Sequence, residues 1–443
     1  MRRSGCGKIL VRSQRCITCA RNGRRCEMAV TQLPEKKKIG GIRPFHIWVT
    51  SLVIMLLIGG WGIYQTLWNG LQVTNLTDQV PWGLWITHDL SAIALGAGAF
   101  TFSAVVYLFR IKRFEPVARM AVFVGFLGYT SAMLALAMDI GRPDRFWHPL
   151  VYWNVHSVLW EITLCVILYS TVLVIELLPI LFDSRLFDNR PKWRAFGHKL
   201  HKLTPVMAVL GMALSLLHQS SLGATYGVLS GRAIWYKPSM PVMFILSAIA
   251  GGVSATLLVT MITSKLTNQE LIDKFLRRDI ARLAAFTLLA YMYLKLWDWL
   301  ATSYYSQAPG TMDAMIRLQA TTPYSQSFWL LEILLCGIVP AAILLNREMR
   351  RREWPLMGAL ALVVFGVIIN RWNVTLSGLV VPPQWSPGVL GHTIAVAYTP
   401  SWVEIAVSVG VLGYALLAFT LGAKYLPLFN HSHHAASQAA PTD

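Results

Sequence analysis

Long apolar segments alternate with short polar ones along most of this chain. Ten apolar segments reach the roughly 20 residues that a helix needs to cross a bilayer. The fifth is the least regular, because HQSS interrupts its outer end. The pattern predicts an all-α polytopic membrane protein with about ten transmembrane helices, at residues 45–68, 84–109, 117–138, 157–181, 205–224, 240–263, 280–303, 325–346, 355–378 and 402–424.

Lysine and arginine are distributed unevenly between the two sides of this helix pattern. Counted connection by connection, 32 of the 39 lie on the side of the two termini and five on the opposite side. Cytoplasmic loops carry the excess of Lys and Arg in membrane proteins. We therefore expect both termini to be cytoplasmic, in a bacterial inner membrane.

Composition supports membrane insertion and argues against nucleic-acid binding. Hydrophobic residues make up 55% of the chain and charged residues 14%, whereas soluble domains carry about 25% charged residues. The net charge of +18 comes from short basic blocks between apolar segments. A nucleic-acid reader would instead gather its basic residues on one soluble face.

Three regions are expected along the chain: a basic cytoplasmic tail at 1–42, a membrane domain at 43–427 and a disordered tail at 428–443. Cys6, Cys16, Cys19 and Cys26 all lie in the first tail. They could form a four-ligand zinc site. We expect instead that the tail is disordered, or is in part an upstream extension before a start at Met28.

Ionisable side chains inside spanning helices are unfavourable by about 2.5–3.5 kcal/mol each at the membrane centre, so their positions are informative. With the orientation set by Lys and Arg, nearly all fall in the outer half of the membrane. Lys295 lies near mid-depth and Glu176 near the inner end. The bias predicts a polar cavity that opens outward, walled by members of the set Asp89, Asp139, Glu161, His218, Asp298, Glu332, Arg371 and Glu404.

The depth of each residue separates functional from structural explanations. Asp89, Glu161 and Arg371 lie too deep for helix capping, and we expect Arg371 to pair with a carboxylate because an unpaired buried charge is unfavourable. Asp139 and Glu404 lie at helix ends, where capping or headgroup contact explains them equally well.

The outer connection between the third and fourth helices reads DIGRPDRFWHPLVYWNVHSVLWE. Tryptophan alone is common at membrane surfaces. Here it is mixed with imidazole, guanidinium and carboxylate groups directly above the predicted cavity. The mixture fits the mouth of a site for a planar amphipathic ligand, with Arg142, His148, Asn154 and His156 as candidate binding residues.

Several common cofactor and catalytic motifs are absent from the sequence. It has no phosphate-binding glycine loop, no His-Glu-x-x-His and no haem c motif. His88 and His218 could in principle be axial ligands of a b haem, although their spacing does not require it. We expect no haem, Fe–S cluster or metal ion in the membrane domain.

Seven segments taken in order resemble the NrfD/PsrC family of membrane subunits, and are most similar to its HybB branch, the quinone-reactive subunits of certain nickel–iron hydrogenases. The resemblance covers roughly 43–427. His88 and the WDWL segment around Asp298 depart from the HybB pattern. The segments are PWGLWITHDLSAIALGAGAF, GYTSAMLALAMDIGRPDRFW, NVHSVLWEITLC, LLHQSSLG, FWLLEILL, INRWNVTLSG and YTPSWVEIAVSVG.

The resemblance implies two related four-helix bundles, formed by helices two to five and six to nine, with flanking helices. It also implies that quinone (menaquinone or ubiquinone) binds near the outer face. A periplasmic ferredoxin-like Fe–S subunit would dock there, linked to a large catalytic subunit such as a hydrogenase. The family-matching polar positions are Asp89, Asp139, Arg142, Asn154, Glu161, His218, Gln219, Glu332, Arg371 and Glu404.

Quinone reduction consumes two electrons and two protons, and the protons need titratable groups near the quinone carbonyls. We expect His218 to hydrogen-bond one carbonyl and Asp139 or Glu161 to relay protons. Asp89 would orient His218 or Arg371, and Gln219 would contribute to binding. Two other functions remain open at this point: a secondary transporter, or a passive anchor without quinone chemistry of its own.

Overall fold

The computed structural model describes residues 44–230, 232, 234–305, 318–380 and 398–429. Within them the chain is helical without strands, and ten helices are long and apolar enough to cross a membrane. This confirms the predicted fold class. The predicted tail at 1–42, with its possible zinc site, lies outside the described residues. So does the predicted tail at 428–443, apart from residues 428 and 429. The spanning helices are α1 (Pro44–Asn69), α2 (Leu84–Leu108), α3 (Glu115–Asp139), α5 (Val158–Phe182), α7 (Thr204–Gly227), α8 (Met240–Thr267), α9 (Lys274–Leu300), η5 (Gln326–Ile338) continued by α11 (Val339–Leu345), α13 (Glu353–Val380) and α14 (Trp402–Tyr425).

Side-chain caps set several of these helix starts. The Ser157 hydroxyl accepts a hydrogen bond from the Trp160 amide at the start of α5. The Asp273 carboxylate accepts from two amides and starts α9 at Lys274, six residues before the predicted 280. Caps of this kind satisfy amides that have no partner inside the helix. The early turns of α9 are polar, so hydropathy could not find them.

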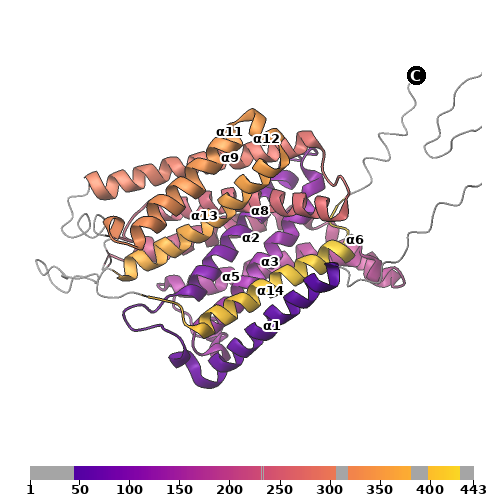
Figure 1. The fold of residues 1–443 in the computed structure, drawn as a ribbon. Helices are drawn as coiled ribbons and strands as arrows, with labels where there is room; N and C mark the ends of the chain where they lie inside the picture. Colours follow the sequence, from indigo (N-terminus) through magenta and orange to yellow (C-terminus); the bar gives the residue numbers. More distant parts are fainter. Residues whose placement is uncertain (1–43, 231, 233, 306–317, 381–397, 430–443) are drawn as a thin grey trace, which may run out of the picture. The chain divides into compact units, whose positions relative to one another are not determined.

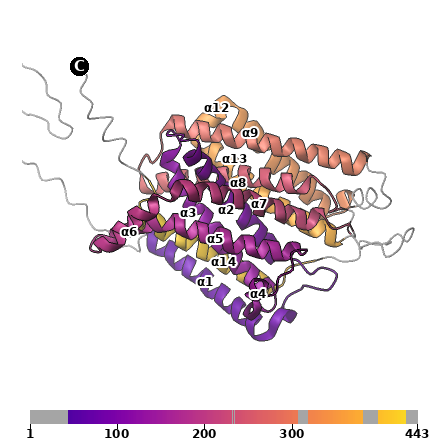
Figure 2. The same ribbon diagram turned by 180° about the vertical axis from the view of Figure 1, so that it is seen from behind.

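The helices pack as two bundles side by side. α2, α3, α5 and α7 contact one another, and so do α8, α9, α11 and α13. The bundles meet mainly where α2 lies against α8. Figures 1 and 2 show α1 and α14 together beside the first bundle, and α9, α11 and α12 (Arg347–Arg351) on the opposite side. The short helices α4 (His148–Val151) and α6 (Pro191–His201) lie at opposite ends in Figure 2. The end that carries α4 is called the outer end below, following the predicted orientation.

The two bundles carry matching sequence segments at matching places. LSAIA occurs at 90–94 in α2 and again at 246–250 in α8. L-x-E-I-x-L-C occurs at 159–165 in α5 and again at 330–336 in η5. Together with the parallel contact pattern, these repeats make the second bundle a copy of the first, as the family resemblance implies. In this repeat Glu161 is equivalent to Glu332, and Cys165 is equivalent to Cys336.

Glycine brings the two copies into close contact. A Cβ atom added at Gly98 of α2 would lie 1.7 Å from the Ala248 carbonyl oxygen, and one at Gly252 of α8 would lie 2.1 Å from the Ala99 amide nitrogen. The contact is between backbones, so no side chain can rotate away to make room. Small residues allow membrane helices to approach this closely.

Replacing Gly98 by Ala should therefore separate α2 from α8 and destabilise the protein by about 1–3 kcal/mol, the usual range for overpacking. Thermal unfolding of the detergent-solubilised protein, followed by tryptophan fluorescence, measures the loss. Gly358→Ala in α13 is the control, because its added Cβ would meet nothing within 4 Å. Equal unfolding temperatures for the two variants would contradict this account of the helix contact.

Candidate functional site

Three helices of the first bundle bring polar side chains together in its outer half. His218 of α7 is fully buried, and the Tyr129 hydroxyl of α3 lies 2.9 Å from its Nδ1. Asp89 of α2 is buried and lies close enough to Asp139, at the end of α3, for the two carboxylates to interact electrostatically. Gln219, also buried, follows His218 on α7. We call these five residues the first cluster.

Most of the first cluster has hydrogen-bonding capacity left over. No described residue partners Asp89 Oδ1, Asp139 Oδ1, His218 Nε2 or either amide atom of Gln219. Buried polar groups in proteins nearly always have a partner, whether protein, water or ligand. Unpartnered atoms on these four residues therefore suit the first cluster to holding a polar molecule.

Glu161 of α5 is hydrogen-bonded to α7 close to the first cluster. The Ser221 hydroxyl, one turn beyond His218 on α7, donates to Glu161 Oε1 at 2.6 Å. Glu161 is only half-buried. Its bond to Ser221 places it about one helical turn from His218, and the proton relay expected of it stays a prediction.

The four loop candidates make no hydrogen bond to this cluster within the described part of the chain. Arg142, Asn154 and His156 are exposed, and His148 is half-buried between the rings of Trp147 and Tyr152. Arg142 pairs with the exposed Asp144 at 3.2 Å, and this contact lowers the pKa of the Asp144 carboxyl. The loop therefore offers a surface for a partner, and its role in binding a small ligand stays a prediction.

The second bundle holds a polar network around Glu332 of η5, which we call the Glu332 network. Lys295 Nζ of α9 lies 2.7 Å from Glu332 Oε1, and Asn370 Nδ2 of α13 donates to the same oxygen at 2.9 Å. Asn373 Nδ2 donates to the other oxygen, Oε2, at 2.6 Å. Glu332 is thus neutralised by one cation and fixed by two amides. Its hydrogen-bonding capacity is far more fully used than that of the first cluster.

The expected pairing of Arg371 with a carboxylate is wrong. Among the described residues, Arg371 donates to Asn370 Oδ1 at 2.7 Å and to the Ser247 hydroxyl at 2.9 Å. Its guanidinium also lies 3.7 Å from the centre of the Phe244 ring, a cation–π contact. The reason is that Glu332, the carboxylate in this network, already has Lys295 as its counter-ion.

Asp89 was expected to orient His218 or Arg371, but another residue holds His218. Tyr129, and not Asp89, makes the hydrogen bond to His218 Nδ1. Sequence reasoning missed Tyr129 because a lone tyrosine in an apolar helix carries no distinctive signal. The second bundle has a counterpart, Tyr291, whose hydroxyl lies 3.5 Å from Glu332 Oε1.

Glu404 acts as a helix cap. Its carboxylate accepts from the Ser401 amide at 2.8 Å, while the Ser401 hydroxyl accepts from the Glu404 amide, which is a capping box at the start of α14. The Asn75 amide and the Tyr398 hydroxyl also donate to it. These contacts explain its full burial, so the structural explanation for Glu404 is confirmed.

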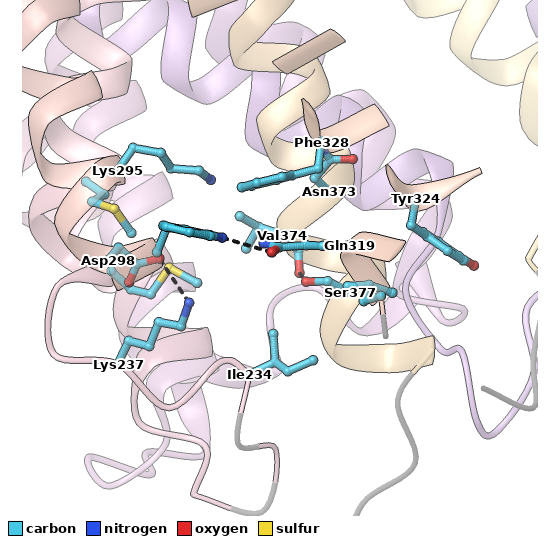
Figure 3. A pocket seen from close by; sticks show the side chains of 14 residues that line it. Ile234, Lys237, Lys295, Asp298, Gln319, Tyr324, Phe328, Asn373, Val374 and Ser377 are labelled. Carbon is cyan, nitrogen blue, oxygen red and sulfur yellow. Dashed lines mark hydrogen bonds and ion pairs between the residues drawn. The ribbon is translucent and has the colours of Figure 1, made fainter. Parts of the chain in front are cut away.

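A cavity opens at the outer end of the second bundle, among α8, α9, η5 and α13 (Figure 3). Its water-accessible interior is about 60 Å³, and about 650 Å³ including the open mouth. A cavity on this side was predicted, but of the eight residues expected to wall it, all within the described ranges, Asp298 alone does so. Its polar walls are Lys237, Lys295, Asp298, Gln319, Asn373 and Ser377, with Trp299, Tyr324 and Phe328 among the apolar ones.

Lys237 and Asp298 form an ion pair in the wall of this cavity. Lys237 Nζ lies 2.9 Å from Asp298 Oδ2, and both side chains are about nine-tenths buried. Burial lowers the pKa of the Lys237 ammonium, and the Asp298 carboxylate opposes that effect. In the sequence Lys237 counted only as one of five outer cations. Its pairing with a carboxylate 61 residues away could be found only from the fold.

A family model described as "Polysulphide reductase, NrfD" matches residues 72–383. That is well over half of the chain, and the matched region contains every residue of the first cluster and of the Glu332 network. The chain therefore belongs to the NrfD family, and it is a polytopic integral membrane protein.

Three relatives show the range of the family. The integral membrane subunit of menaquinone reductase from Nitratidesulfovibrio vulgaris is 34% identical over 89% of this chain and 94% of its own length. A selenate reductase subunit from Mesobacillus selenatarsenatis is 25% identical over 87% and 94%. The probable Ni/Fe-hydrogenase 2 b-type cytochrome subunit of Escherichia coli is 27% identical over 90% and 96%.

Proposed function

We propose that this chain is the membrane subunit through which an oxidoreductase complex exchanges electrons with the quinone pool. Quinone would bind at the first cluster, near the non-cytoplasmic face. The observation that supports this most strongly is the set of unpartnered buried atoms on Asp89, Asp139, His218 and Gln219. A quinone offers two carbonyl oxygens on a flat ring, and the unpartnered atoms come from three different helices, α2, α3 and α7.

Each group in the first cluster has a role in this proposal. His218, held by Tyr129, would donate from Nε2 to one carbonyl oxygen. Asp89 and Asp139 would hold the protons that the reduced ring takes up, since a carboxyl group can both give and receive a proton. Glu161 would connect them to the bundle surface. The two electrons would arrive from a partner, because we expect no redox group within this membrane domain.

The partner would be a periplasmic ferredoxin-like Fe–S subunit bound to a large catalytic subunit. The outer loop favours docking, since Phe146, Tyr152 and Trp153 are each about two-thirds exposed and an exposed aromatic patch is typical of a protein interface. A nickel–iron hydrogenase is the catalytic partner implied by the sequence resemblance. The names of the relatives extend the choice to other reductases and favour menaquinone as the quinone. We keep the prediction that the chain carries no haem, although one relative is named a b-type cytochrome subunit.

Tyr129 and Tyr291 offer a matched test of where quinone binds. Tyr129→Phe removes the hydroxyl that holds His218, and quinone turnover by the complex should fall about tenfold, the loss expected for one hydrogen bond in a buried site. Tyr291→Phe removes a weak contact to a carboxylate that keeps three others, so turnover should change less than about twofold. The assay is quinone-analogue reduction by the complex that copurifies with the tagged chain. Equal effects of the two variants would count against the first cluster.

A further inference from the structure

The internal repeat allows the first cluster and the Glu332 network to be compared residue by residue. In the repeated segments Glu161 corresponds to Glu332. Ser221 donates a hydrogen bond to Glu161, and Asn373 donates one to Glu332. Matching these two donors aligns HQSS (218–221) of α7 with NRWN (370–373) of α13. In this alignment His218 corresponds to Asn370. The second bundle thus contains a counterpart of the proposed quinone site.

Several residues differ between the two sites: Asn370 and Arg371 stand where the first cluster has His218 and Gln219, and Ile245 stands where it has Asp89. Tyr129 and Tyr291 each extend a hydroxyl from the second helix of their bundle to a buried polar side chain. If these two tyrosines are matched, Met133 of the first bundle corresponds to Lys295 of the second. Lys295 brings a positive charge to Glu332 and also lines the outer cavity. The second bundle therefore lacks the unpartnered carboxylate of Asp89, and the carboxylate of Glu332 is ion-paired. Its open space lies on the outer side of the Lys295–Glu332 pair.

The walls of this cavity have spare donors and occupied acceptors. Each lysine ammonium has three N–H groups. Among the described residues Lys237 forms an ion pair only with Asp298, and Lys295 only with Glu332. Gln319 Nε2 has no partner there, while its Oε1 accepts from Trp299 at 2.9 Å. A molecule that fits these walls must supply acceptor oxygens.

The apolar walls select for a flat ring. Lys295 Nζ lies 5.4 Å from the centre of the Phe328 ring, and Figure 3 shows its amino group directed toward that ring across the cavity. Trp299 and Tyr324 add two more aromatic side chains to the lining. The interior of about 60 Å³ is too small for a whole quinone ring, so a bound ring would extend into the open mouth.

We propose that this cavity is a second quinone site, which takes the oxidised form of the quinone. The ligand class rests on the proposed function; the location does not. An oxidised quinone presents only acceptors to Lys295, Lys237 and Gln319. A quinol could accept from the same donors, but each of its hydroxyl hydrogens would also need an acceptor, and the wall oxygens of Asp298 and Gln319 already accept hydrogen bonds. The first cluster, with its unpartnered carboxylate oxygens, accommodates both forms.

Photolabelling can test the second site independently of the first. The intact complex is placed in phosphatidylcholine nanodiscs and exposed to a photoreactive naphthoquinone analogue, and labelled peptides are mapped by mass spectrometry. We expect label on α7 near His218 and, separately, on the 318–329 segment. Excess unlabelled naphthoquinone should remove both labels.

Two matched variants assign each label to its site. Ser377→Leu fills the outer cavity without stranding a buried charge, and should abolish the 318–329 label while keeping the α7 label. Gln219→Leu should do the reverse. Gln319→Leu is the milder alternative to Ser377→Leu if that variant does not assemble, and should weaken the 318–329 label about fivefold, as loss of one hydrogen bond predicts.

The possible outcomes are distinct. Label on α7 alone overturns the second site and leaves the proposed function standing. Label on neither segment overturns both, and label at 318–329 alone supports the second site while removing the first. A phospholipid phosphate would also supply acceptor oxygens. If replacing phosphatidylcholine by phosphatidylglycerol suppresses the 318–329 label, the cavity is a lipid site and the proposal is wrong.

Discussion

Replacing Asp89 by Asn should stop quinone chemistry while leaving the complex assembled. The change keeps the shape of the side chain but removes its ability to hold a proton. General acid–base groups contribute about 10²–10⁴ to a rate, so we expect quinone-analogue turnover to fall at least about 100-fold. Reduction or oxidation of a soluble dye by the catalytic subunit should stay unchanged, because that reaction bypasses this chain.

His218→Leu should give the same separation of activities, since it removes the only imidazole in the first cluster. Asp78→Asn is the control: it removes an exposed carboxylate from the same outer face and should change neither activity. Survival of quinone turnover in both cluster variants would favour a passive anchor. Loss of dye activity together with quinone turnover would show instead that the variants disturb assembly.

The fold was predictable because lipid imposes simple rules on sequence. A helix needs about 20 apolar residues to cross, and basic residues stay on the cytoplasmic side. These rules placed all ten spans within a few residues, except the polar start of α9. There Asp273 caps a turn that lies outside the apolar run. Side-chain capping is local chemistry, and a hydropathy pattern averages over it.

The membrane depth of the candidate site residues could be predicted from the sequence, but their hydrogen-bond and ion-pair partners could not. Depth follows from counting residues along one helix, so the outer-half position of Asp89 and His218 could be read directly. Partnership depends on which helices are neighbours and how each is rotated. Arg371 therefore looked like the counter-ion of a carboxylate, although Lys295 fills that place for Glu332.

The internal repeat is the signal that could have found more of the site. L-x-E-I-x-L-C at 159–165 and 330–336 identifies Glu161 and Glu332 as equivalent from the sequence alone. Lys295 then stands out. It puts a charge on α9, the helix that precedes the second copy of this motif, at the position matched to Met133 of the first bundle. Lys237 would still be missed, because a lysine in an outer loop gives no indication that it folds back onto Asp298.

The ion pair between Lys295 and Glu332 should be the largest single electrostatic contribution to stability in the second bundle. Lys295→Met copies Met133 of the first bundle and leaves the Glu332 carboxylate buried without a cation. Breaking a buried pair in this way destabilises a protein by about 3–5 kcal/mol. Both side chains are at most 10% exposed, so solvent screening reduces the effect little. Reversible unfolding in mixed detergent micelles measures it.

The effect should also be asymmetric. Glu332→Gln leaves Lys295 charged, but Asp298 lies three residues further along α9 and already interacts with Lys295 electrostatically, so the ammonium has a second carboxylate to turn to. We therefore expect Glu332→Gln to destabilise the protein less than Lys295→Met does. The double variant Lys295→Met/Glu332→Gln should recover at least about 2 kcal/mol relative to Lys295→Met alone, because residues in contact show coupling energies of this size. If the two single losses simply add in the double variant, the two residues do not form a pair in the membrane.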